Sequence, residues 1–235
     1  MSQPVKIVVK GEGFTKALRA YKQASKKSWE QIFAKTAKEL AAKIIRVTPP
    51  FDVRGSDIEN DAAAKRRGQD TIAGDLSRVF TSSVDTLRKN GVQTRPTAAE
   101  VGKNSNTATM RALHSQLRNN KGRVPKSYKA RILVKKMALA RYTKMVQRRV
   151  GYLGAGWERG AMITKARTPS WVKRHSAPSQ ATVKVSESRL IAEFKNNVPF
   201  AGLSQLQRRV DFATSRQAAA MMRQVAYFAK KRVTI

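Results

Sequence analysis

The clearest pattern of apolar and polar positions in the chain is an amphipathic helix before the Pro49-Pro50 pair. Its apolar side chains are Trp29, Phe33, Ala37, Leu40, Ile44 and Val47. At 100° per residue, Phe33 to Val47 fall within about 80° of one another. The cations on the far side are Lys35, Lys38, Lys43 and Arg46. Because proline has no backbone N–H and disfavours a helical residue before it, we expect the helix to end near Val47 or Thr48.

Short β-branched stretches predict the strands of a small sheet. Residues 4–10 (PVKIVVK) are bounded by Gly11 and Gly13, which is typical of a strand. Residues 181–185 and 190–195 alternate between apolar and polar side chains on either side of a Ser-Glu-Ser turn. This alternation predicts a β-hairpin.

Further helical periodicity predicts helices at 62–80, 108–117, 130–150 and 203–232. The first has Ile72, Leu76, Val79 and Phe80 on its apolar side. The apolar residues of the 130–150 helix point nearly all round, which predicts contacts on several sides, as between subunits. Residues 51–61 are expected to form a loop. Residues 81–106 are rich in Ser, Thr, Asn and Gly, which predicts a long exposed excursion.

The last predicted helix carries two contrasting faces. Its apolar stripe consists of Val210, Gln217, Met221, Val225 and Phe228, with Ala218 beside them. The opposite face carries four cations at a constant spacing of seven, namely Arg209, Arg216, Arg223 and Lys230. A seven-residue step drifts by only about 20°, so these cations form a basic rail about 30 Å long. The rail is either the solvated face of a core-packing helix, or a surface that follows phosphates or lines the channel of an assembly.

Together these elements predict an α+β fold, with a small antiparallel sheet packed against long helices, a long loop or hairpin excursion and a C-terminal helix. The length of 235 residues suits a single domain over 1–235 with the excursion at about 81–106. With 41% hydrophobic residues, the chain can bury a core rather than remain a disordered basic tail.

Charge narrows the classes of function. The chain has 48 Lys and Arg against 15 Asp and Glu, a formal net charge of +33. Such self-repulsion indicates that a polyanion or an acidic partner belongs to the working state. Residues 101–157 contain 14 Lys and Arg and no acidic residue. A solvated face normally mixes both signs, so a polyanion-facing surface is an equal alternative to a merely solvated one.

The residue types of most enzyme sites are missing. The chain has no cysteine, and its two histidines, His114 and His175, lie far apart without metal-ligand spacing. No Walker-type loop occurs, and Gly11-Glu12-Gly13 falls short of a dinucleotide fingerprint. We therefore expect no catalytic residues, no metal, no cofactor and no enzymatic activity. No apolar run reaches the roughly 18 residues of a membrane span, and the amino terminus lacks signal-peptide regions, so a reducing aqueous compartment is expected.

Three weaker candidates favour structural explanations. Asp70 and Asp75 lie about 140° apart on a helix and are expected to be surface charges rather than a metal pair. The acidic residues Asp52, Asp57, Glu59 and Asp61 are expected to pair with surplus cations rather than to bind a divalent ion. Trp171, near Lys173 and Arg174, could stack on a base, but a packing role is favoured.

Several segments, taken in order, resemble the head-to-tail joining (neck, tail-completion or minor tail) proteins of tailed bacteriophages. These segments are RVTPP at 46–50, AKRRGQDTIAGDLSRVF at 64–80, RVGYLGAGW at 149–157, PSWVKRH at 169–175, and the hairpin before the final helix. The resemblance implies a small sheet packed on helices with a long excursion. It also implies a structural virion protein, assembled in the host cytoplasm, without enzymatic activity.

The resemblance further implies a homo-oligomeric ring of six or twelve copies between the portal or adaptor protein and the tail proteins. Genomic double-stranded DNA would pass through the lumen, and no membrane would be involved. The residues expected to face the DNA channel or another polyanion are Arg209, Arg216, Arg223, Lys230, Lys135, Lys136, Arg148 and Arg149. The large charge departs from the family's pattern, because strong phosphate binding would hinder DNA ejection. The alternative is a sequence-nonspecific nucleic-acid-binding protein.

Overall fold

The structure, a computed structural model, describes residues 5–8, 29–54, 57–58, 60–119, 122–185, 190–199 and 206–233. The chain divides into two compact units. The first unit comprises Met1–Asp61 and Gly151–Ile235, and the second comprises Ala62–Val150. In the sequence, the second unit is thus inserted between the two halves of the first. The single domain over 1–235 stays a prediction.

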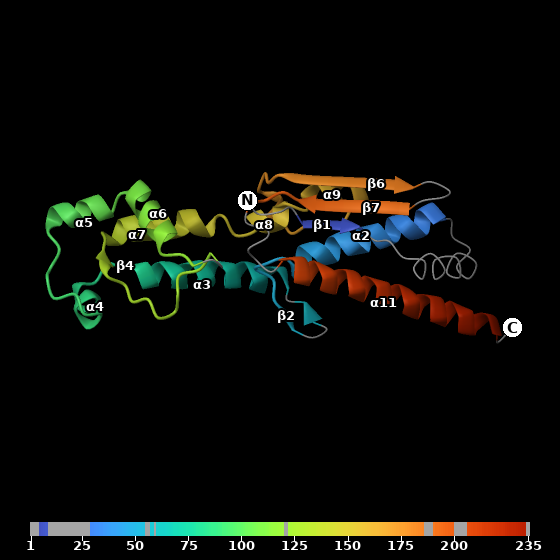
Figure 1. Cartoon of the computed structure of the whole chain (residues 1–235), viewed down its shortest axis with the longest axis horizontal. Coiled ribbons are helices and arrows are strands. Elements are labelled where there is room, and N and C mark those ends of the chain that lie inside the picture. Colours follow the sequence, from blue (N-terminus) through green and yellow to red (C-terminus); the bar gives the residue numbers. More distant parts are fainter. Residues whose placement is uncertain are drawn as a thin grey trace. The chain divides into compact units, whose positions relative to one another are not determined.

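The first unit combines a small sheet with two long helices (Figure 1). Its strands are β1 (Val5–Val8), β2 (Val53–Arg54), β3 (Asp57–Ile58), β6 (Ser179–Val185) and β7 (Leu190–Asn196). Its helices are α2 (Trp29–Val47), α8 (Tyr152–Ala155), α9 (Glu158–Thr164), α10 (Ser170–Lys173) and α11 (Leu206–Val233). The α+β class, the first strand, the hairpin and both long helices are confirmed. The expected loop at 51–61 contains the short β2–β3 pair.

The sheet of the first unit is antiparallel, in the order β1-β7-β6, with β7 in the centre. Phe194 of β7 lies opposite Ile7 of β1 on one side and Ala181 of β6 on the other. Ala192, Phe194 and Asn196 are buried, whereas the residues between them are half-buried. The alternation of apolar and polar positions therefore places one face of β7 in the core.

Helices α2 and α11 lie side by side and supply most of the remaining core (Figure 1). Every predicted apolar residue of α2 from Phe33 to Val47 is buried. In α11 the buried stripe is Val210, Ala213, Gln217 and Met221. Ala213 belongs to this stripe, whereas Ala218, which the sequence analysis placed beside it, is exposed. The side chains of Trp29, Val225 and Phe228 lie outside the described residues.

Two glycines allow α8 and α9 to approach β7 closely. A Cβ at Gly160 would lie 2.4 Å from Cδ1 of Phe194. A Cβ at Gly156 would lie 2.1 Å from Oδ1 of Asn196. Asn196 is fully buried, and its side chain donates to the carbonyl of Leu153 at 2.9 Å and accepts from the amide of Val198 at 3.1 Å. A side chain at Gly160 would collide with Phe194, and one at Gly156 would collide with Asn196, so this close packing on β7 requires glycine at both positions.

The second unit is mainly helical. It contains α3 (Asp61–Val79), α4 (Val84–Lys89), α5 (Ala98–Asn104), α6 (Thr107–Gln116) and α7 (Lys136–Gln147). Its two short strands, β4 (Phe80–Thr81) and β5 (Ile132–Leu133), pair in parallel. Its core includes Leu76, Val79, Phe80, Met110, Val124, Val134, Tyr142 and Val146. The helices predicted at 62–80 and 108–117 are confirmed, and Ile72 of the first is half-buried.

The helix predicted at 130–150 begins later than expected. Ile132 and Leu133 form β5, and α7 starts only at Lys136. With these residues removed from the helix, Tyr142 and Val146 form a single buried face. The predicted all-round apolar character was therefore wrong for α7, whereas the intersubunit contacts inferred from it stay a prediction. Most residues of the predicted excursion at 81–106 are exposed or half-buried, and it carries α4 and α5, which were not predicted.

Candidate polyanion-binding surfaces

The first cation of the predicted rail, Arg209, stabilises the core of the first unit. Its Nη1 donates to the carbonyl of Val47 at 3.1 Å and to that of Phe51 at 2.7 Å. The last carbonyls of a helix have no partner within the helix, so Arg209 satisfies the end of α2 and the loop that follows. Arg209 is half-buried and serves the fold rather than a free surface.

The remaining rail positions differ from one another in the structure. Arg216 is half-buried, and its guanidinium lies 5.3 Å from the ring centre of Phe212. Arg223 is exposed, and the side chain of Lys230 lies outside the described residues. At 100° per residue, Arg209 lies roughly 90° from the centre of the buried stripe, and the drift carries each later cation farther from it. The four residues therefore do not share one environment, and the rail begins at the flank of the α2–α11 contact.

A small polar group lies where α2 meets α11. The Nζ of Lys43 donates to Oε1 of Gln217, and Nε2 of Gln217 donates to Oε2 of Glu39 at 2.7 Å. Burial lowers the pKa of Lys43, Glu39 opposes this shift, and the nearby charges of Arg216 and Arg223 add to it. Lys43 is half-buried, so the prediction that it lies on the solvent-exposed side of α2, opposite the apolar face, was wrong. These bonds satisfy the buried side-chain amide of Gln217. The contact between Lys43, Gln217 and Glu39 therefore has a structural role.

The second unit carries the denser surface charge. It contains 21 Lys and Arg and four Asp and Glu. The four predicted polyanion-facing residues of this unit, Lys135, Lys136, Arg148 and Arg149, are all exposed. Lys135 and Lys136 stand at the start of α7, and Arg148 and Arg149 follow its end. A helix of this length separates the two pairs by roughly 18 Å, so they form two sites rather than one.

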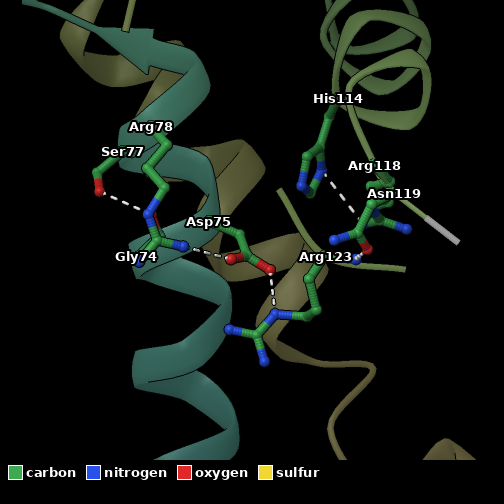
Figure 2. Close-up of polar contacts among 8 residues, drawn as sticks. All are labelled: Gly74, Asp75, Ser77, Arg78, His114, Arg118, Asn119 and Arg123. Atoms are coloured by element: carbon green, nitrogen blue, oxygen red, sulfur yellow. Dashed lines mark hydrogen bonds and ion pairs between the residues drawn. The ribbon is translucent and has the colours of Figure 1, made fainter. Parts of the chain in front are cut away.

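Asp75 is buried, which overturns its predicted role as a surface charge. Only 5% of the residue is exposed. Its Oδ1 accepts from Nη1 of Arg78 at 2.8 Å, and its Oδ2 accepts from Nε of Arg123 at 2.7 Å (Figure 2). Periodicity alone could not show this burial, because the partner Arg123 lies 48 residues farther along the chain.

His114 lies close to this ion pair network and is also buried, at 2% exposure. Its Nδ1 is 3.4 Å from the hydroxyl of Tyr142 and 3.3 Å from a guanidinium nitrogen of Arg118 (Figure 2 shows the Arg118 contact). Burial lowers the pKa of His114 to about 4, Arg118 adds to the shift, and Asp75 opposes it. Because Arg118 can only donate, this geometry assigns the ring proton to Nε2, which has no partner among the described residues.

The charges of three arginines act on the hydroxyl group of Tyr142. Burial raises the pKa of Tyr142, whereas the charges of Arg118, Arg111 and Arg149 each lower it. These residues come from α6, the turn after α6 and the turn after α7, and all three are exposed. Of these three arginines, only Arg149 was predicted from the sequence to face a polyanion. The helical spacing of Arg111, His114 and Arg118, at three and then four residues, was the available signal.

The weaker sequence candidates have structural roles. Trp171 is 7% exposed, and its ring centre lies 5.5 Å from that of Phe51. Its favoured packing role is therefore confirmed. Asp61 lies 3.7 Å from a guanidinium nitrogen of Arg46, in agreement with the expected pairing of acidic loop residues with cations. The side chain of Glu59 lies outside the described residues.

The described residues contain no group of three His, Asp or Glu side chains placed to hold a metal ion. Within the same residues, no helix has the length and hydropathy needed to cross a membrane. Exposed arginines are numerous among the described residues, and their guanidinium groups can bind phosphate and carboxylate oxygens through paired hydrogen bonds.

No protein-family model matches the chain, and neither does any curated protein or any solved structure. The resemblance to phage neck proteins therefore depends on the sequence segments quoted above.

Proposed function

We propose that this chain is a structural virion protein of a tailed-phage neck. In this proposal it forms a homo-oligomeric ring of six or twelve copies, binds the portal or adaptor protein and the tail proteins, and surrounds the DNA channel. It performs no catalysis and needs no cofactor. Its place in the particle is the neck or tail.

One observation carries the proposal. Of the 14 cations in the acid-free stretch 101–157, the 13 that the structure describes are all exposed. A folded surface that concentrates one sign of charge repels itself unless a partner of opposite charge is present. Duplex DNA, with its dense phosphates, supplies such a partner without requiring sequence recognition.

Exposed apolar side chains support an assembly rather than an isolated chain. Among the described residues, the large exposed ones are Met137, Met162, Ile163, Phe212 and Met222. Methionine adapts its shape to a partner surface, and it is enriched at the centres of protein interfaces. These residues occur in both units, which agrees with contacts to several neighbours.

Native mass spectrometry of the purified protein, in high and low salt, tests the proposal. We expect a closed ring of six or twelve copies, and imaging of the phage particle is expected to place that ring in the neck. A protein that stays monomeric at both salt concentrations and is missing from the particle would contradict the proposal.

The second candidate is a sequence-nonspecific nucleic-acid-binding protein, which the same exposed cations favour. It predicts binding to random duplex whose affinity falls steeply with salt, by a slope of about −0.9 per phosphate neutralised. Binding without ring formation would favour this candidate. Because Arg209 supports the core, charge-removing variants of α11 should be made at Arg216, Arg223 and Lys230, with Arg209 unchanged.

A further inference from the structure

Arg111, Arg118 and Arg149 lie on or just after α6 and α7, two helices that contact each other and carry the buried His114 and Tyr142. Arg111 lies on α6 one turn before His114, and Arg118 follows the end of the same helix. Arg149 follows the end of α7, which contacts α6. All three side chains are exposed, whereas Tyr142 and His114 beneath them are buried. The sequence brings them together only through the packing of α6 on α7.

His114 holds one of these guanidinium groups in place. Arg118 donates to Nδ1 of His114 at 3.3 Å, and the same ring nitrogen lies 3.4 Å from the hydroxyl of Tyr142. Guanidinium has five N–H donors in a rigid fork, so this contact leaves several donors for a ligand. A positioned guanidinium loses less side-chain entropy on binding than a mobile one.

Among the described residues, no carboxylate pairs with this cluster of three arginines. The nearby carboxylate of Asp75 is already shared by Arg78 and Arg123 (Figure 2). No ion pair between described residues involves Arg111, Arg118 or Arg149. The cluster therefore presents three positive charges to an external anion.

The surroundings of the cluster favour phosphate over an acidic protein. Protein interfaces centre on apolar residues and are depleted of charge there, whereas nucleic-acid interfaces are polar and strongly positive. None of the large exposed apolar side chains among the described residues lies on α6 or in the turn at 148–150. In addition, all three cations are arginines, whose forked donors match two oxygens of one phosphate.

We infer that Arg111, Arg118 and Arg149 form a phosphate-binding surface that contacts the backbone of duplex DNA, with His114 as the positioning residue for Arg118. The inference rests on the proposed function for the choice of duplex DNA as the polyanion. Contacts to the backbone alone would tolerate any sequence.

The test compares two triple variants of the full chain by fluorescence anisotropy with a labelled random-sequence duplex over a series of salt concentrations. The first variant combines Arg111→Gln, Arg118→Gln and Arg149→Gln. The matched control, Arg88→Gln with Lys89→Gln and Arg95→Gln, removes the same charge from exposed cations of the same unit. Thermal melts establish that both variants are folded.

We expect the cluster variant to lose about tenfold or more in affinity, with a salt slope smaller by up to about 2.7, and the control to lose at most two- to threefold. Equal losses in the two variants would overturn the inference, because they would show a general charge effect. Unchanged affinity in the cluster variant would overturn it as well. A parallel titration uses poly-glutamate in place of the duplex. If the cluster variant lost binding to poly-glutamate but kept its binding to the duplex, the inference would also be overturned, because that result would identify an acidic protein as the partner.

Native mass spectrometry of the same variants separates this inference from the proposed function. A ring that persists in the cluster variant while duplex binding is lost supports both. A monomeric protein whose duplex binding depends on the cluster would remove the neck proposal and leave the phosphate-binding surface in place.

Discussion

Nε1 of Trp157 donates a hydrogen bond of 3.0 Å to Oγ1 of Thr48, a residue 109 positions earlier in the chain. Both residues are almost fully buried. The Thr48 hydroxyl also donates to the carbonyl of Ile44 at 2.7 Å, so all the polar atoms of this contact are satisfied. The bond joins the end of α2 to the start of α9, and thus links the two parts of the first unit across the inserted second unit.

Thr48→Val is expected to destabilise the first unit by about 1–3 kcal/mol, because it leaves the buried indole N–H of Trp157 without an acceptor. The free energy of unfolding from urea titration measures this loss. Thr214→Val is the matched control, since the Thr214 hydroxyl donates to the carbonyl of Val210 within its own helix. We expect the control to change stability by less than about 0.5 kcal/mol. Equal losses in the two variants would show that the Trp157 contact contributes nothing.

Alanine at two helical glycines is expected to have opposite effects. Gly160→Ala places a Cβ 2.4 Å from the ring of Phe194, so α9 must move away from β7, at a cost of about 1–3 kcal/mol. Gly102→Ala in α5 meets no atom within 4 Å and should stabilise by up to about 1 kcal/mol, because alanine favours a helix. Thermal unfolding of both variants tests this, and a neutral Gly160→Ala would contradict the close approach of α9 to the sheet.

The elements that the sequence predicted well are those whose periodicity is long and local. The nineteen residues of α2 repeat one apolar face, and Pro49 fixes its end. The β6–β7 hairpin has seven residues in each strand, and the apolar–polar alternation within 181–185 and 190–195 predicted it. The β4–β5 pair has only two residues per strand and joins Phe80 to Ile132. No local pattern could indicate such a pair, and for that reason Ile132 and Leu133 were assigned to a helix.

The candidate sites were harder to predict, because their residues meet only through tertiary packing. Arg209 has the spacing of a surface rail, yet its position beside the buried Val210 directs it to the end of α2. Asp75 is of a residue type that is normally exposed, yet its ion pair with Arg123 offsets the energetic cost of burying the carboxylate. Charge counts located the acid-free stretch correctly, but they could not separate cations that support the fold from those free to bind a ligand.

Asp75→Asn is expected to destabilise the second unit by about 1–3 kcal/mol, because it removes the negative charge that Arg78 and Arg123 share. The cost stays below that of a fully buried ion pair, since the side chain of Arg123 is half exposed. Asp70→Asn, at an exposed position of the same helix, is the control and should be nearly neutral. Chemical denaturation measures both, and a neutral Asp75→Asn would contradict the structural role of the carboxylate.

The lowered pKa of His114 predicts that the second unit loses stability in mild acid. His114 has a pKa of about 4 when folded, below the ordinary value of 6.5. Between these pH values His114 is protonated in the unfolded chain but neutral in the folded chain. The free energy of unfolding therefore falls as the pH drops from 6.5 towards 4, by about 2–3 kcal/mol in all. In His114→Gln this contribution disappears, so the difference in unfolding free energy between pH 7 and pH 5 should shrink, whereas His175→Gln should keep it. An identical pH dependence in His114→Gln and the unaltered protein would show that the imidazole is not held neutral by burial.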